Sequence, residues 1–350
     1  MNANRTVKPK LKGCIMAHEL ELNENGEARM FYAGQKPWHG LGQEVETELT
    51  SAGAIRLGGL DWDVEKRELY FQAGDAVQHI ADKKAIVRLE DERILGIVNK
   101  TYEMIQNSDA FEFLDGLVGE GLAMYHTAGS LFGGKRIFIC CKLPETFKVA
   151  DDVIEKYLVA MTSHDGSTAF HIKWTPIRVV CNNTLSMAFD INSRGKVQTN
   201  QDVVSIRHTK NFKDGLEQAR GILKLSEGYY DRVEAVFNQL LATPMSEAEY
   251  QSFSEQVIPK TFIDEDGKVS KVGETLWQKK QDELLDCWHN GIGLDGLEDT
   301  KWKAYNAVTE YADHRKKFAP KKNPVADARM NSVIWGHSAE LKKKAVMLLS

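Results

Sequence analysis

Short turns between β-rich runs most constrain what this chain can fold into. His164-Asp165-Gly166-Ser167 separates the runs 157–162 and 168–174, and Glu90-Asp91-Glu92-Arg93 separates 85–89 from 94–98. Asp-Gly between strand-like runs is a strong hairpin signal, because glycine adopts the positive φ that a tight turn needs. Gly133-Gly134, just before a third β-rich run at 135–141, predicts another hairpin. Adjacent antiparallel strands are therefore the expected framework.

Helical signals dominate the second half of the chain. A long helix is predicted over 211–241, and Ser246-Glu-Ala-Glu249 is a capping box that begins the next one. Helices are expected over about 274–318 and after the linker 319–324. Hairpins followed by helices, without regular β-α-β alternation, predict an α+β fold: an antiparallel, hairpin-rich sheet packed on helices, then a mainly helical C-terminal part. The predicted divisions are an extended lead-in (1–30), an α+β core domain (31–215), a mainly helical region (216–318), and a basic linker with a short helix (319–350).

Three local predictions concern element boundaries. Ser108 is predicted to cap a helix that contains Phe111 and Leu114, since its hydroxyl can accept a first-turn amide. Pro176 is predicted to end the strand that begins near Thr168, and a buried helix is expected over 178–189.

Charge is unevenly distributed along the chain. The formal net charge is −5, yet residues 1–12 carry four basic residues and no acid. Residues 301–350 carry eleven basic and four acidic residues, a net charge of +7, which leaves −16 for the middle. Clustered positive charge attracts polyanions locally, because salt screens charges over about 8–10 Å. Binding of nucleic acid and simple solvation of charged ends are both compatible with this pattern.

Composition sets further limits. No uncharged apolar run approaches the roughly 20 residues needed to cross a bilayer, and no apolar segment follows the basic start as in a secretory signal. The five cysteines are odd in number and form no C-x-x-C pair. We therefore expect a cytoplasmic protein without membrane association and without a metal site.

A polar constellation is the candidate binding site. In the run 170–175, Phe170, Ile172 and Trp174 alternate with His171, Lys173 and Thr175, and the aromatic residues are more typical of a core than of base stacking. Basic and amide side chains hold phosphate and sugar oxygens. The predicted nucleic-acid-binding residues are Lys135, Arg136, Lys173, Arg178, Asn182, Asn183, Thr184, Arg207, His208 and Lys210. The alternative is that the asparagine pair caps a helix.

Two other groups have chemical potential. Trp38 and His39 lie in a Pro- and Gly-rich stretch that predicts a fixed loop, either structural or functional. Asp61, Asp63, Glu65 and Lys66 resemble the acidic sets of magnesium nucleases, although such patterns arise by chance in a chain with 50 acids. The chain contains neither G-x-x-x-x-G-K-[ST] nor G-x-S-x-G.

Four motifs resemble one known family. They are Trp38-His39-Gly40-Leu41-Gly42, the run Thr175-Pro-Ile-Arg-Val-Val-Cys-Asn-Asn-Thr-Leu185, Arg207-His208-Thr209 and the run from Trp302 to His314. Together they resemble the phage/plasmid-like proteins of domain of unknown function 932. The resemblance implies a gene carried by phages or plasmids, and it implies no reaction and no catalytic residue.

The leading expectation is a non-enzymatic protein of phage or plasmid DNA metabolism. It would bind or anneal single-stranded DNA in recombination or replication, as a homo-oligomer and without a cofactor. One alternative is a metal-dependent nuclease that uses Mg²⁺ at the Asp61–Lys66 acids. Another is an interaction protein that binds a host factor in defence evasion through its C-terminal helices.

Overall fold

The computed structural model describes residues 29–33, 43–45, 50–178, 183–184, 198–200, 203–212, 214, 227–263, 269–317 and 325–350. Its strands are β1 (Met30–Ala33), β2 (Gln43–Val45), β3 (Val64–Ala73), β4 (Ala76–Arg88), β5 (Arg93–Asn99), β6 (Met124–Leu131), β7 (Arg136–Val149), β8 (Asp152–Ser163), β9 (Phe170–Arg178), β10 (Asn183–Thr184), β11 (Gln198–Asn200) and β12 (Val203–Ile206). Its helices are α1 (Ser51–Leu57), α2 (Asn107–Gly119), α4 (Glu227–Ala242), α5 (Glu247–Val257), α6 (Lys271–Asn290), α7 (Lys301–Glu310), the π-helix η1 (Tyr311–Arg315), α8 (Val325–Ile334) and α9 (His337–Leu349).

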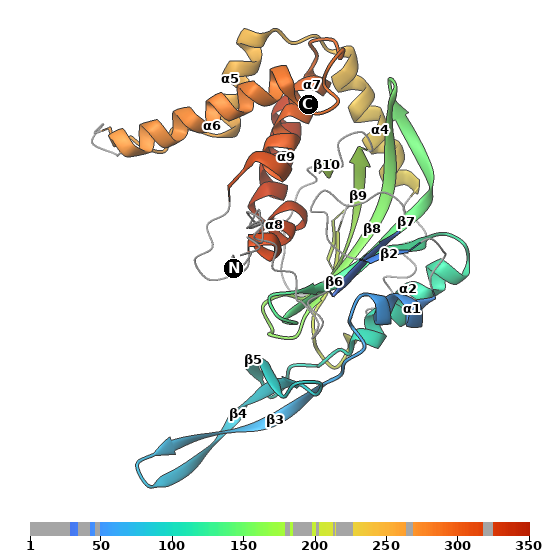
Figure 1. The fold of residues 1–350 in the computed structure, drawn as a ribbon, viewed down its shortest axis with the longest axis vertical. Helices are drawn as coiled ribbons and strands as arrows, with labels where there is room; N and C mark the ends of the chain where they lie inside the picture. The colour runs from blue at the N-terminus through green and yellow to red at the C-terminus, as the bar shows by residue number, and fades with distance from the viewer. Residues whose placement is uncertain are drawn as a thin grey trace, which may run out of the picture.

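The strands form two sheets (Figure 1). The larger sheet has the order β11-β12-β9-β8-β7-β6-β1-β2, with β10 pairing with β9. Its pairs are antiparallel apart from the parallel pair of β1 with β2. The smaller sheet has the order β3-β4-β5. The fold is therefore α+β, with a hairpin-rich sheet followed by helices, as the sequence predicts.

Each face of the larger sheet has its own apolar cover. Phe170 on β9 packs edge to face against Phe113 of α2, with the ring centroids 5.8 Å apart. At the other end of the same face, Tyr230 of α4 both donates to the carbonyl and accepts from the amide of Tyr157. On the opposite face, Phe138 and Met161 pack against α8. The predicted alternation along β9 is confirmed, but both of its faces are buried.

The main hydrophobic core continues from the sheet into the C-terminal helices. Phe237 of α4 lies 4.9 Å from the ring centroid of Trp302 on α7, and Trp302 donates to the Asp152 carboxylate at 2.9 Å. One buried cluster includes Phe111, Phe170 and both of these aromatic residues. The division into domains stays a prediction. Within the part of the chain that the structure describes, no helix combines the length and apolarity of a membrane span.

The smaller sheet projects from the body as a long hairpin, drawn in blue and cyan in Figure 1. At its base, Arg88 is buried, lies over the Trp62 ring and binds Asp91 at 2.6 Å. Arg88 holds the pKa of the Asp91 carboxyl down at about 2, chiefly through this hydrogen bond. Farther out, Tyr70, Phe71 and Val77 are exposed. The predicted turn at 90–93 thus joins β4 to β5 and anchors the hairpin.

Several predicted boundaries are confirmed. The turn containing Asp165 and Gly166 joins β8 to β9, and Gly166 has φ +71°. Gly133 and Gly134 join β6 to β7, both with positive φ. Ser246 caps α5 and exchanges hydrogen bonds with Glu249, as the capping box predicts.

Three local predictions are wrong. Ser108 is not the cap, because α2 begins at Asn107 after Gln106, and the Asn107 side chain instead binds the carbonyl oxygens of Leu60 and Trp62. Pro176 does not end the strand, because it pairs with Lys156 on β8. On the other side of β9, β12 pairs only with residues 170–173, so no described hydrogen bond is lost there at Pro176, which has no amide proton to donate. The helix predicted from Arg178 is replaced there by strand pairing of β10 with β9.

Candidate nucleic-acid interface

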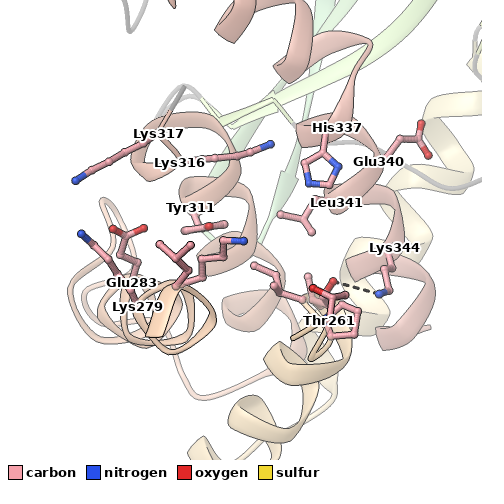
Figure 2. Close-up of a pocket in the computed structure, with 15 residues that line it drawn as sticks. Thr261, Lys279, Glu283, Tyr311, Lys316, Lys317, His337, Glu340, Leu341 and Lys344 are labelled. Carbon is pink, nitrogen blue, oxygen red and sulfur yellow. Dashed lines mark hydrogen bonds between the residues drawn. The ribbon is translucent and has the colours of Figure 1, made fainter. Parts of the chain in front are cut away.

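A cavity of about 670 Å³ lies where four parts of the chain meet (Figure 2). They are the end of α5, the middle of α6, η1 with the two residues that follow it, and α9. The floor of the cavity is apolar and buried, and it includes Val257, Tyr311 and Leu341. Five lysines also line the cavity, which we call the lysine pocket: Lys279, Lys280, Lys316, Lys317 and Lys344. An apolar floor under several ammonium groups suits a ligand that carries both negative charge and an apolar part.

Helix α6 supplies one wall of the lysine pocket. Ser270 caps the first turn of this 20-residue helix, and Leu276, Lys279, Lys280 and Glu283 recur at spacings of three to four residues along its pocket side. Trp277 fixes this half of α6, because its indole N–H donates to the Ile258 carbonyl at 2.8 Å. The positions of the two lysines are therefore set by packing against the segment that follows α5.

Helix α9 supplies the facing wall. His337, Glu340, Leu341 and Lys344 lie at helical spacing on one face of α9, and all four line the pocket. Lys344 also donates to the Val257 carbonyl at 3.2 Å, which ties α9 to the end of α5. Figure 2 shows His337, Glu340 and Lys344 opposite Lys279 and Glu283 across the cavity.

Behind the pocket, one buried ion pair and one partly exposed pair hold η1 against its neighbours. Lys342 of α9 binds Asp313 at 2.8 Å, and both side chains are almost fully buried. Glu310 is also buried; it binds Arg315 at 3.1 Å and accepts from the Ile292 amide at 2.6 Å. The i+5 hydrogen bond from the Lys316 amide to the Tyr311 carbonyl closes the π-helix. Such bulges are frequent at functional sites. This one places Lys316 and Lys317 at the pocket.

The pocket is electropositive. The lining contains five lysines and two acids, Glu283 and Glu340, so its net charge is +3 with His337 neutral. Burial, then the nearby Lys280, lowers the pKa of Lys316 to about 8. Burial, then Lys316 and Lys280, also lowers the pKa of His337. Because these cations repel one another, a bound anion would relieve the repulsion.

The predicted binding residues do not converge on one surface. Lys173 is buried, and its ammonium group donates to the Ile334 carbonyl of α8 at 3.1 Å. Arg136 is half-buried and binds Ser167 Oγ and Asn331 Oδ1. Both side chains therefore join the sheet to α8 and to the β8–β9 turn.

His208 also has a structural setting. Its ring stacks on Tyr102, with the centroids 4.7 Å apart. Its Nδ1 lies 3.1 Å from the Glu103 carbonyl and its Nε2 lies 3.1 Å from Thr162 Oγ1. Burial lowers the pKa of His208 to about 4, so the ring is neutral at neutral pH. Two occupied ring nitrogens leave no donor for a phosphate.

The remaining predicted residues are exposed or are described only in part. Lys135, Arg207 and Lys210 are exposed, so phosphate can reach them. Arg178 ends β9 and pairs with Asn183 in the backbone, and Thr184 pairs with Ile177. Asn182 and the loop residues Trp38 and His39 lie outside the described residues.

The acids of the nuclease hypothesis do not form a metal-binding group in the described structure. Asp61 and Asp63 are exposed on either side of buried Trp62, while Glu65 pairs with Arg67. Among the residues with described positions, no three His, Cys, Asp or Glu side chains come together in a group able to hold a metal ion.

Sequence reasoning missed the lysine pocket, although one signal pointed to it. The +7 charge of residues 301–350 includes Lys316, Lys317 and Lys344. Lys279 and Lys280 lie far from them in sequence, within the acidic middle. Only the packing of α6 against η1 and α9 brings the two sets together.

Comparison with known proteins gives one match. The family model for Domain of unknown function (DUF932) matches residues 94–335, more than two thirds of the chain. No curated protein and no solved structure matches. The resemblance predicted from the four sequence motifs is confirmed, and the chain belongs to the DUF932 family.

Proposed function

We propose that this protein binds single-stranded nucleic acid, with the lysine pocket contacting the backbone phosphates. The observation that carries the proposal is the convergence of five lysines on one cavity of about 670 Å³. Lysine ammonium groups neutralise phosphates and release their counterions. We propose that the activity is non-enzymatic and serves DNA annealing, recombination or replication of a phage or plasmid.

The shape of the pocket favours a single strand over a duplex. A cavity of this volume falls in the range of roughly 300–1,000 Å³ that is typical of pockets for single small ligands. A flexible strand can bend one phosphate and its neighbouring base into such a cavity, whereas a rigid duplex presents its phosphates on a convex surface.

Three variants with the same change in charge test the proposal. The first replaces Lys279, Lys280 and Lys317 of the pocket with Gln, and the second replaces Lys83, Lys100 and Lys148, which are exposed elsewhere. The third replaces Lys135, Arg207 and Lys210, the exposed members of the site predicted from sequence.

Fluorescence anisotropy with a labelled single-stranded oligonucleotide, at two salt concentrations, measures each variant. The pocket variant is expected to lose about tenfold or more in affinity, with a salt dependence shallower by about two units of slope. The Lys83/Lys100/Lys148 variant is expected to bind as the wild type does. A loss of affinity confined to the Lys135/Arg207/Lys210 variant would place the interface at those residues of the larger sheet instead of at the pocket. Absence of binding by the wild type at low salt would end the proposal.

The apolar floor favours a second candidate, an acidic peptide of a host factor with hydrophobic anchors. Val257 and Leu341 would receive the anchors while the lysines pair with the carboxylates. An acidic amphipathic peptide that binds more tightly than the oligonucleotide, with the affinity lost in the pocket variant, would favour this candidate.

A further inference from the structure

We propose that the lysine pocket binds a terminal phosphate monoester of a nucleic-acid strand in preference to an internal phosphodiester. This inference rests on the proposed function, since it specifies which part of the strand enters the pocket.

The lysines reach the pocket from three separate segments of the chain. Lys279 and Lys280 come from α6, Lys316 and Lys317 come from the end of η1, and Lys344 comes from α9. In Figure 2, Lys279 and Lys317 lie on one side of the cavity and Lys344 lies on the other, with Lys316 between them. A strand that passes through a site needs a groove with its cations spaced along the backbone. Cations from three segments at one closed cavity suit a single group of high charge.

The floor supports the same conclusion. Val257, Tyr311 and Leu341 are each less than 10% exposed, so they close the inner end of the cavity. A strand entering from the open side therefore meets packed side chains. The end of a strand fits this geometry without a second opening.

Charge then distinguishes a terminal phosphate from an internal one. A phosphodiester carries a single negative charge, whereas a phosphate monoester carries about −1.5 to −2 at neutral pH. Coulomb attraction grows with the product of the charges, and the pocket lining has a net charge of +3. Lys316 is half-buried, so water screens its attraction less than it screens an exposed lysine.

Three oligonucleotides of one sequence test the inference: one with a 5′-phosphate, one with a 3′-phosphate and one with hydroxyl groups at both ends. Each carries its fluorophore at an internal base, and ionic strength is held constant. At least one phosphorylated strand is expected to bind about fivefold or more tightly than the hydroxyl strand, because it adds one charge beside several lysines. The comparison of the two phosphorylated strands identifies the end.

The variants of the previous subsection assign the effect to the pocket. The preference is expected to disappear in the Lys279/Lys280/Lys317 variant and to persist in the Lys83/Lys100/Lys148 variant. Equal binding of all three strands, still weakened in the pocket variant, would overturn this inference and leave the proposed function standing. Failure of every strand to bind the wild type would overturn both.

Discussion

The lysine pocket and the projecting β3–β4 hairpin are two exposed regions that are supported in opposite ways. The distal hairpin, residues 69–81, contains Asp75 as its only Asp, Glu, Lys or Arg residue and exposes Tyr70, Phe71 and Val77. It is held by the pairing of two strands. The pocket exposes lysines, yet it stands on the buried Lys342–Asp313 ion pair and on packed segments of α5, α6, η1 and α9. A surface with a fixed geometry can select a ligand by shape and charge, whereas an isolated two-stranded ribbon is marginally stable by itself.

Removing one member of the buried pair behind the pocket should have the largest effect. Asp313→Ala leaves the Lys342 ammonium buried and without its carboxylate, which is expected to lower the free energy of unfolding by about 3–5 kcal/mol. Urea denaturation measures the change. The double variant Asp313→Leu/Lys342→Met removes both charges and should recover most of the loss. Equal destabilisation of the single and double variants would show that the pair does not support the pocket.

The junction between the two sheets can be strained at one glycine. A Cβ at Gly96 on β5 would lie 2.4 Å from the Asp165 Cα, so the β8–β9 turn and the smaller sheet must separate. Gly96→Ala is expected to cost about 2–3 kcal/mol in thermal or urea unfolding. Gly119→Ala is the control, because a Cβ there meets nothing within 4 Å. Equal stability of the two variants would contradict the close contact.

Acid should weaken the same junction through two buried histidines. Burial lowers the pKa of His164 to about 3 and that of His208 to about 4, against about 6.5 in an unfolded chain. Between these values the unfolded chain binds protons that the folded one does not. Stability is therefore expected to fall as pH drops from about 6.5 to 4, by up to about 1.4 kcal/mol per pH unit for each histidine.

Urea midpoints at several pH values test this dependence. His208→Gln should make it shallower, since it removes one of the histidines whose pKa is lowered by burial. A slope that stays the same in His208→Gln would assign the acid sensitivity to other residues.

Shortening the hairpin should have the smallest effect. Glu68 pairs with Lys84, so an Asn-Gly turn in place of residues 69–83 closes the ribbon between them. The change in unfolding free energy is expected to stay within about 0.5 kcal/mol, and oligonucleotide binding should be unaltered. Light scattering on both proteins completes the test. If the shortened form had a smaller assembly mass than its deleted residues explain, the hairpin would instead join copies of the chain.

Local signals in the sequence were sufficient for much of the fold. The turn at Asp165-Gly166 and the capping box at Ser246 depend on neighbouring residues alone, and both are confirmed. Tertiary contacts decided the cases that failed. Asn107 is drawn into hydrogen bonds with the segment that precedes β3, and Arg178 lies in a strand because β8 and β10 flank it.

The candidate site was hidden for a related reason. Asp313 and Lys342 look like ordinary surface charges in the sequence, and their burial as a pair becomes visible only in the fold. Conversely, Lys173 was expected at a phosphate site and lies beneath α8. Charge along a sequence gives the sign of a surface, and helix packing decides which charges share a cavity.

The covering of one sheet face by α8 has a consequence for the growing chain on the ribosome. The hydrogen bond of Lys173 needs Ile334, which is synthesised 161 residues later, and that of Arg136 needs Asn331, which is synthesised 195 residues later. At the usual rates of synthesis, that interval lasts roughly 10–30 s or more. During that time Met161 and Phe138 lack their cover. This apolar face of the sheet is therefore exposed on the nascent protein until α8 emerges, and exposed apolar surface of that kind is prone to aggregate.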